Sequence, residues 1–115
     1  MRPLVHPKRG ELSLVGLLYA LGDPLRLEIV ERISARDGLT CGETVRGSVP
    51  KATLSRQLKV LRDHGVIQAQ QRGRQYYNSL RREDIDARFP GLLDAVLAGT
   101  RKTATRAKVR RRANR

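Results

Sequence analysis

The sequence is poor in aromatic residues and in cysteine, and both shortages restrict what it can form. Its 115 residues include one Phe, three Tyr and no Trp, so a core has to be built from Leu, Val, Ile and Ala. The one cysteine, Cys41, cannot form an internal disulfide, which favours a reducing cytoplasm. No apolar run reaches the ~18 residues that a membrane-spanning helix needs, so we expect no membrane partner.

The N-terminal region resembles a secretory signal in part, and this alternative stays open. Arg2, Lys8 and Arg9 precede an apolar stretch, residues 12–21, that ends at small residues. Polar and small residues interrupt that stretch, however, and a helix-start signal follows it at once. We therefore expect residues 1–10 to be a flexible N-terminal segment of a cytoplasmic protein.

Positive charge is in excess, and it gathers at the C-terminus. The chain has 24 Lys and Arg against 11 Asp and Glu, a formal net charge of +13. Residues 100–115 hold eight basic residues and no acidic one, which leaves a net charge of +5 for residues 1–99. A basic body with a strongly basic end indicates a polyanionic partner, nucleic acid rather than an anionic membrane. Residues 99–115 are predicted to be a disordered basic tail.

The spacing of apolar residues predicts helices and one hairpin. The predicted helices cover residues 11–21, 24–35, 51–64 and 89–98, with a short helical piece within 43–46 and a helical turn at 83–86. Two strands, residues 66–71 and 75–80, flank Arg72, Gly73 and Arg74, and a glycine in a three-residue connection is a hairpin signal. The predicted fold class is mostly α with a small β-hairpin, in one domain over residues 11–98.

The first two predicted helices carry distinctive signals. Asp23 followed by Pro24 marks a helix start, because Asp accepts hydrogen bonds from free amides and Pro lacks the N–H that would stay unpaired there. In the preceding helix four leucines recur at spacings of three and four: Leu14, Leu17, Leu18 and Leu21. One side of this stripe can face the core and the other a partner subunit, which predicts a homodimer.

The helix over residues 51–64 has one apolar and one polar, basic face. Three leucines recur on it at helical spacing: Leu54, Leu58 and Leu61. At about 100° per residue, Arg56 and Lys59 lie on the opposite face. The major groove of DNA admits one α-helix, and a basic hairpin beside it can contact phosphates or enter the minor groove. The sequence therefore predicts binding to double-stranded DNA.

Three segments resemble the ArsR family of winged helix-turn-helix repressors. ALGDPLRL (residues 20–27) resembles its characteristic opening, TLSRQLKVLRDHGVI (residues 53–67) its recognition helix and the strand after it, and RGRQYYNSL (residues 72–80) its wing. The resemblance implies a winged helix-turn-helix regulator that dimerises through its first and last helices. Two recognition helices would then occupy successive major grooves of a near-palindromic operator, with half-sites about 34–36 Å apart.

By their positions in these motifs, six residues would lie in or near the major groove: Lys51, Ala52, Thr53, Ser55, Arg56 and Gln57. Arg56 can form paired hydrogen bonds to guanine, and Gln57 can do so to adenine. Phosphate contacts, which set register rather than sequence, would come from Thr53, Ser55, Lys59, Arg72 and Arg74. The alternative, which stays open, is that these are ordinary solvated charges. Tyr76 and Tyr77 are expected to pack within the wing.

Many ArsR relatives sense metals, but this sequence lacks the ligand pairs that such sites use. Where relatives carry two closely spaced cysteines it offers only Cys41, and its last helix has Asp94 without a histidine. We expect structural roles for His6 and His64, and no metal or other cofactor. Cys41 is interpreted as either a small buried apolar residue or a thiol that senses oxidants.

No set of catalytic residues is visible, so we expect no enzyme. The rival function is a nonspecific nucleic-acid-coating or nucleoid-associated protein, driven by the basic tail. The predicted base-reading helix argues against it, because coating needs no such face. The sequence identifies neither the operator nor an inducer.

Overall fold

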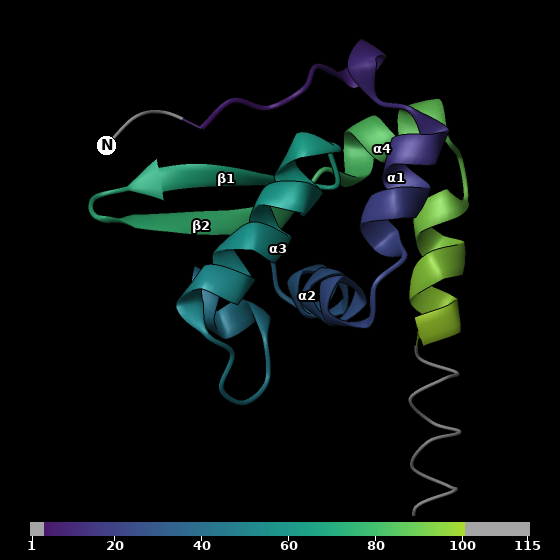
Figure 1. The fold of residues 1–115 in the computed structure, drawn as a ribbon. Coiled ribbons are helices and arrows are strands. Elements are labelled where there is room, and N and C mark those ends of the chain that lie inside the picture. Colours follow the sequence, from purple (N-terminus) through teal and green to yellow (C-terminus); the bar gives the residue numbers. More distant parts are fainter. Residues whose placement is uncertain (1–3, 101–115) are drawn as a thin grey trace, which may run out of the picture.

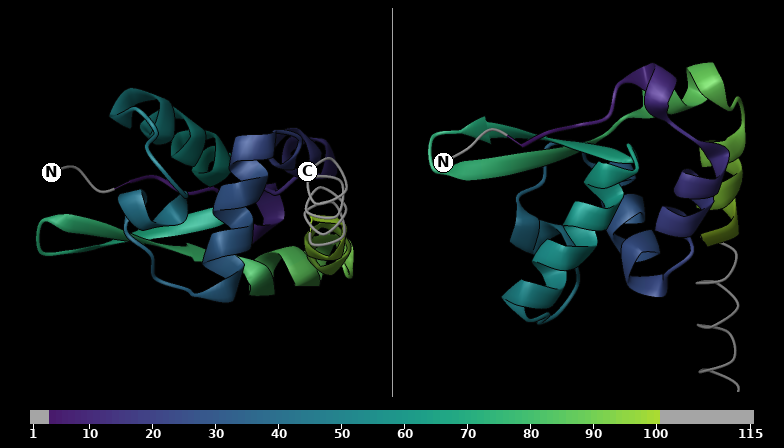
Figure 2. Two further views of the ribbon diagram at one scale, coloured as in Figure 1. Left: turned by 90° about the horizontal axis from the view of Figure 1, so that it is seen from below. Right: turned by 45° about the horizontal axis from the view of Figure 1, so that its top comes forward.

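The structure, a computed structural model, describes residues 4–100, and in it a β-hairpin projects from a group of packed helices (Figures 1 and 2). In chain order the elements are η1 (Arg9–Glu11), α1 (Leu14–Leu21), α2 (Pro24–Ala35), η2 (Cys41–Thr44), α3 (Lys51–Asp63), β1 (Ile67–Arg72), β2 (Gln75–Leu80) and α4 (Arg82–Arg88), where η marks a 3-10 helix, followed by helical residues 92–100. In Figure 1, α3 and the hairpin lie on one side and α1 with residues 92–100 on the other, with α2 between them. The predicted fold class is confirmed.

Capping side chains determine where the first two helices begin. The Asp23 carboxylate accepts hydrogen bonds from the amides of Leu25 and Arg26, both at 3.0 Å, and Pro24 occupies the first helical position. The predicted bounds of α2 are therefore confirmed. The preceding helix starts at Leu14 and not at residue 11, because the Ser13 hydroxyl caps it by accepting from the Gly16 amide at 3.0 Å.

The core is aliphatic, as the shortage of aromatic residues requires. Its largest fully buried hydrophobic side chains are Leu17, Ile29, Ile33, Leu58, Leu61, Ile67, Ile85 and Leu93, together with the smaller Val30 and Val66. They come from α1, α2, α3, β1, α4 and residues 92–100, so one core joins both sides of the molecule. Each such side chain contributes roughly 1.5–3 kcal/mol on burial.

The hairpin is tighter than the sequence suggests. Arg72 pairs with Gln75, so the turn consists of Gly73 and Arg74 alone and not of a three-residue connection. Gly73 has φ +63°, whereas no residue other than glycine has a positive φ in the described part of the chain. A positive φ at only the first central residue is the pattern of a type II′ turn, whose twist matches that of the strands.

The loop after α2 extends the small sheet by one bridge, which the sequence did not predict. The Asn78 amide donates to the Leu39 carbonyl at 2.8 Å, and the Leu39 amide donates back to the Asn78 carbonyl at 3.1 Å. The Asn78 side chain, 1% exposed, donates from Nδ2 to the same Leu39 carbonyl at 3.1 Å. This bridge joins the middle of the hairpin to the loop after α2.

The N-terminal segment makes contacts that the sequence did not predict: residues 4–11 run along the hairpin and onto α4 (Figure 1). The Ala69 amide donates to His6 Nε2 at 3.0 Å, and the buried Arg81 donates from Nη1 to the Pro7 carbonyl at 2.6 Å. Arg9 pairs with Asp84, Nε to Oδ1, at 2.6 Å. A short window of sequence could not indicate these contacts, because the partners lie more than sixty positions away, and the flexibility of residues 1–10 stays a prediction.

The C-terminal elements also shift from their predicted bounds. The helical turn expected at residues 83–86 is a full helix, α4, and the last helix begins at residue 92 instead of 89. Pro90 and Gly91, the latter with φ +85°, form the turn between them. The predicted basic tail lies almost entirely outside the described residues.

Candidate nucleic-acid interface

One face of α3 is buried and the other is open. Leu54, Leu58 and Leu61 are 7%, 1% and 0% exposed, and they anchor the helix in the core. Five of the predicted contact residues are exposed, and two are half-buried at the edge of this face: Lys51, Ala52, Ser55, Arg56 and Lys59, then Thr53 and Gln57. The leucine stripe thus fixes which way the polar side chains point.

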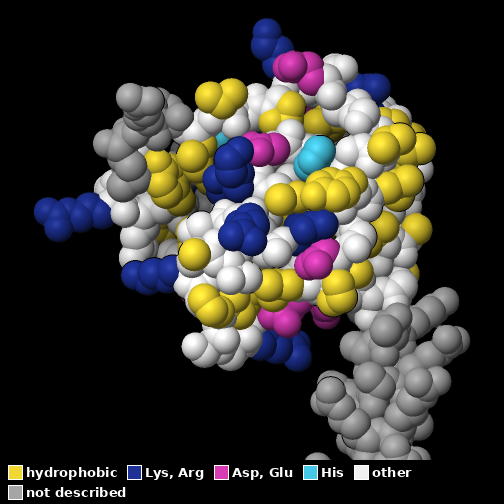
Figure 3. All heavy atoms as spheres, in the orientation of Figure 1, with side chains coloured by type: hydrophobic (Ala, Val, Ile, Leu, Met, Phe, Trp, Pro, Cys, Tyr) yellow, Lys and Arg dark blue, Asp and Glu magenta, His cyan; other side chains and the backbone are white. Residues whose placement is uncertain are grey.

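Basic side chains on this face are available to an external anion. Lys59 Nζ lies 2.6 Å from Asp63 Oδ2, but both side chains are about half-exposed or more, and such an ion pair is worth little in water. Arg56 has no hydrogen-bond or ion-pair partner among residues 4–100. Figure 3, in the orientation of Figure 1, shows Lys and Arg side chains over the part of the surface formed by α3.

Gln57 is held by a residue of another helix whose role the sequence did not reveal. Arg26 of α2 donates from Nη1 to Gln57 Oε1 at 2.7 Å, and it is itself only 9% exposed. The segment LGDPLRL contains this arginine, but the resemblance did not indicate what it does. A signal was present, because a lone arginine among the apolar positions of a short helix needs buried acceptors.

The wing carries two more of the predicted residues. Arg74 is exposed in the turn, and the Arg72 guanidinium lies 5.5 Å from the ring centroid of Tyr77, a cation–π distance. Tyr77 and Tyr76 are half-buried or at the surface of the strand, as side chains of a two-stranded wing must be. Basic side chains extend beyond the free end of the hairpin in Figure 3. α3 and the wing therefore present basic groups on the same side of the molecule.

The interpretation of Cys41 as a buried residue is wrong. Cys41 is exposed at the start of η2, and its sulfur lies 4.0 Å from Asn78 Nδ2. A reactive thiol there stays a prediction. Within residues 4–100, no three His, Cys, Asp or Glu side chains are grouped so that they could hold a metal ion.

Both histidines make structural contacts. The His64 ring packs edge-on against Tyr19 at a centroid distance of 5.3 Å. Partial burial lowers the pKa of His6, and the nearby charges of Arg81 and Arg62 lower it further, while a backbone hydrogen bond to Leu4 opposes them. His6 is therefore favoured in its neutral form, which its acceptor role toward Ala69 requires.

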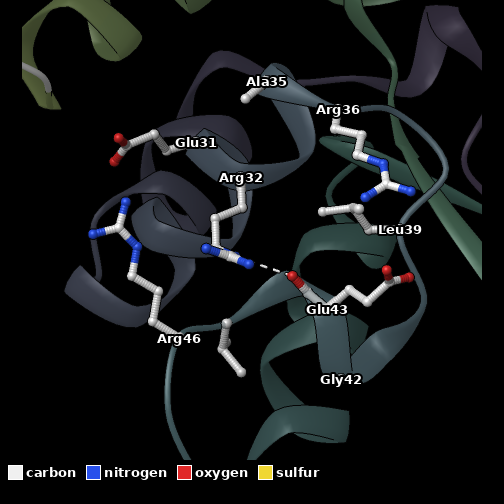
Figure 4. A pocket seen from close by; sticks show the side chains of 9 residues that line it. Glu31, Arg32, Ala35, Arg36, Leu39, Gly42, Glu43 and Arg46 are labelled. Carbon is white, nitrogen blue, oxygen red and sulfur yellow. Dashed lines mark hydrogen bonds between the residues drawn. The ribbon is translucent and has the colours of Figure 1, made fainter.

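A pocket of about 340 Å³ lies between α2 and the segment around η2 (Figure 4). Arg32 Nε donates to the Glu43 carbonyl at 3.0 Å across it, and Arg36, Arg46 and Glu31 stand around its rim. Acidic and basic side chains are mixed on its walls. The pocket therefore presents no single charge that would select a ligand.

Comparisons with known proteins agree with this geometry. The family model described as a helix-turn-helix domain matches residues 21–68, from the end of α1 into β1. A sequence comparison with curated proteins gives no match. None of the described helices is long and apolar enough to cross a membrane.

Three solved structures share the fold. An ArsR family transcriptional regulator, RHA00566, has a TM-score of 0.58 and 24% identity, covering 80% of this chain and 96% of its own. The transcriptional repressor BigR from Xylella fastidiosa has 0.58 and 27%, covering 74% and 83%. Rv0081 of M. tuberculosis has 0.57 and 27%, covering 84% and 90%.

These likenesses, the match of the helix-turn-helix domain and the exposed face of α3 beside a basic wing lead to one assignment. The chain is a DNA-binding transcriptional regulator with the winged helix-turn-helix fold of the ArsR type.

Proposed function

We propose that this regulator is a repressor that binds a near-palindromic operator as a homodimer, with α3 in the major groove. The observation that carries the proposal is the division of α3 into a leucine face in the core and an open face with Arg56, Lys51 and Lys59. BigR, which has this fold, is a repressor. We place the protein in the cytoplasm, where it would meet DNA.

Exposed apolar surface on α1 supports the homodimer. Leu14, Val15, Leu18 and Tyr19 are 45%, 79%, 50% and 59% exposed, and residues 92–100 lie beside them in every view (Figures 1 and 2). Figure 3 shows hydrophobic side chains gathered on this side of the molecule. A contiguous apolar surface of this kind is typical of a protein interface. A two-fold axis there would relate two α3 helices, and if these occupied successive major grooves the operator half-sites would lie about 34–36 Å apart.

Base recognition and phosphate contact are assigned to different residues. We propose that Arg56 contacts a guanine, which offers two acceptors in the major groove. Lys51, Ala52, Thr53 and Ser55 line the groove beside it. Phosphate contacts come from Thr53, Ser55, Lys59, Arg72 and Arg74, and the eight basic residues beyond Gly99 add contacts that depend on charge alone.

Selection of bound duplexes from a random pool, followed by titration, tests the proposal. The selected operator should bind about 10³-fold or more tightly than random DNA at the same salt concentration. Equal affinity for both would reject it in favour of a nonspecific nucleic-acid-coating protein. A footprint on the promoter of the protein's own gene would then place the site.

We further propose that the regulator responds to no metal. Zinc, cadmium or arsenite should leave the operator affinity nearly unchanged, because Cys41 has no second thiol to complete a site in its own chain. The measurement is an operator titration with each ion at a small excess. A stoichiometric metal complex that releases DNA would contradict the proposal.

A further inference from the structure

Arg26 holds a buried charge that links two helices. Burying a guanidinium is costly unless it is hydrogen-bonded, and here each of its three nitrogens has an acceptor. Nε donates to the Ala20 carbonyl at 2.6 Å, Nη2 to the Tyr19 carbonyl at 3.0 Å and Nη1 to Gln57 Oε1 at 2.7 Å. The first two acceptors lie at the C-terminal end of α1, where the helix dipole favours a cation. Arg26 thereby joins α1 directly to α3.

This link fixes the orientation of the Gln57 amide. A guanidinium has donors and no acceptor, so the Gln57 atom that faces it must be the carbonyl oxygen and not the NH₂ group. Turning the amide over would oppose two donors and leave a buried charge partly unpaired. The Nε2 atom consequently points away from Arg26, and no residue within 4–100 accepts a hydrogen bond from it.

The fixed amide has a consequence for base recognition. A glutamine that binds adenine through paired hydrogen bonds needs its oxygen for the adenine N6 amino group and its nitrogen for N7. In this protein Arg26 donates to one of the two lone pairs of that oxygen, which fixes where the other lone pair and the two N–H donors of Gln57 lie. Arg26 therefore sets the order in which Gln57 presents its acceptor and its donors to a base or a phosphate.

We propose that Arg26 is a positioning residue for DNA recognition, which holds the Gln57 amide in one orientation toward the DNA. The proposal rests on the proposed function, since it needs a selected operator. Arg26 touches no DNA in this scheme and acts through Gln57 alone.

The experiment compares base preferences and affinities of the full chain and its variants on the selected operator. Gln57→Ala identifies what Gln57 contacts: a change at one base position per half-site indicates a base, and an equal weakening on all sequences indicates a phosphate. A loss of affinity below twofold on every sequence would show that Gln57 contacts no DNA and would overturn the proposal.

Arg26→Lys tests the positioning role, because one ammonium cannot hold three acceptors as the planar fork does. It should lower operator affinity about fivefold in the wild-type background, as expected for one misplaced hydrogen bond, and less than twofold in the Gln57→Ala background. Equal reductions in both backgrounds would show that Arg26 has a structural role only, and they would overturn its proposed positioning role.

Arg32→Lys is the matched control, since it makes the same change on α2 at a residue that bonds Glu43 and not α3. Thermal unfolding of each variant shows whether it folds. If Arg26→Lys does not fold, Arg26→Gln, which keeps two N–H donors without the charge, is tested in both backgrounds by the same criterion. Failure to select any operator would refute the proposed function instead, so the two failures are distinguishable.

Discussion

The helices α1 and α3, on opposite sides of the molecule, differ in the kind of surface that they leave exposed. On α3 the apolar residues are consumed by the core, and what is left outside is polar or basic. α1 has no charged residue at all, and while Leu17 and Leu21 are buried, Leu14, Val15 and Leu18 remain outside. A helix whose spare surface is apolar needs protein to cover it, and a helix whose spare surface is cationic needs a polyanion. We therefore expect α1 to serve dimerisation and α3 to serve DNA recognition.

The largest effect is expected from placing a charge on the exposed apolar surface of α1. Leu18→Glu should convert the dimer to a monomer and lower operator affinity about 100-fold or more, because each subunit then binds one half-site without the other. Sedimentation or light scattering at micromolar concentration, with operator titration, measures both. Ala35→Glu adds the same charge at the exposed end of α2 and should leave the dimer intact. A tight-binding wild-type monomer would contradict the comparison.

A smaller effect is expected from replacing Arg56 on the exposed face of α3. Arg56→Ala should cost ~1–3 kcal/mol at the operator and relax the preference at one base position per half-site. Lys59→Ala, one turn away on the same face, should weaken all sequences more evenly. Competition titrations with single-base operator variants provide the measurement. If Arg56→Ala lowered operator and random-DNA affinity by the same factor, Arg56 would be a phosphate contact.

Removing residues 101–115 should leave the ratio of operator to random affinity nearly unchanged while weakening both. The deletion takes away eight basic residues, and the slope of log affinity against log salt should fall by about 0.9 for each phosphate that they neutralise. Titrations over a range of salt concentrations give the slope. An unchanged slope would mean that these residues do not bind DNA, and a collapsed ratio would assign them to recognition or to the dimer.

The smallest effect concerns the N-terminal segment beside the wing. Because the pKa of His6 is lowered in the folded protein, folding disfavours its protonation, and the stability that neutral His6 contributes is present above its ordinary pKa of ~6.5. That contribution should be lost as the pH falls from there through the lowered pKa. Thermal unfolding at about pH 7.5 and 5.5 should show a larger destabilisation for wild type than for His6→Gln, whose oxygen can still accept from Ala69. Equal losses of stability in the two proteins would contradict the stabilising role of neutral His6.

Local signals made most of the fold predictable from sequence. The pair Asp23 and Pro24 places the start of α2, and the leucine stripe gives the buried face of α3, because helical periodicity needs only a short window. Gly73 marks the turn of the hairpin for the same reason. In α1 the stripe is divided, with Leu17 and Leu21 buried and Leu14 and Leu18 about half exposed. The exposed residues of α3 follow directly from the buried ones.

Contacts between distant residues could not be predicted in this way. Arg26 and Gln57 are 31 positions apart, Leu39 and Asn78 are 39 apart, and His6 and Ala69 are 63 apart. No short window of sequence contains both partners, and each contact depends on how the helices pack. The resemblance to a recognition helix therefore predicts that Gln57 lies near the major groove, but it cannot indicate the arginine that orients it.

The pair Ala69 and Asn78, at the middle of the hairpin, bears on how the protein avoids aggregation. They lie opposite each other in the register. The backbone hydrogen-bonding groups of each residue point outward, to the edge of the sheet on its own side. One edge is closed because the Ala69 amide donates to His6, and the other because Asn78 exchanges hydrogen bonds with Leu39. A projecting two-stranded sheet with free edges would invite strands of other chains to pair with it. These two short segments block such pairing at the centre of the hairpin, while the turn at its free end stays uncovered.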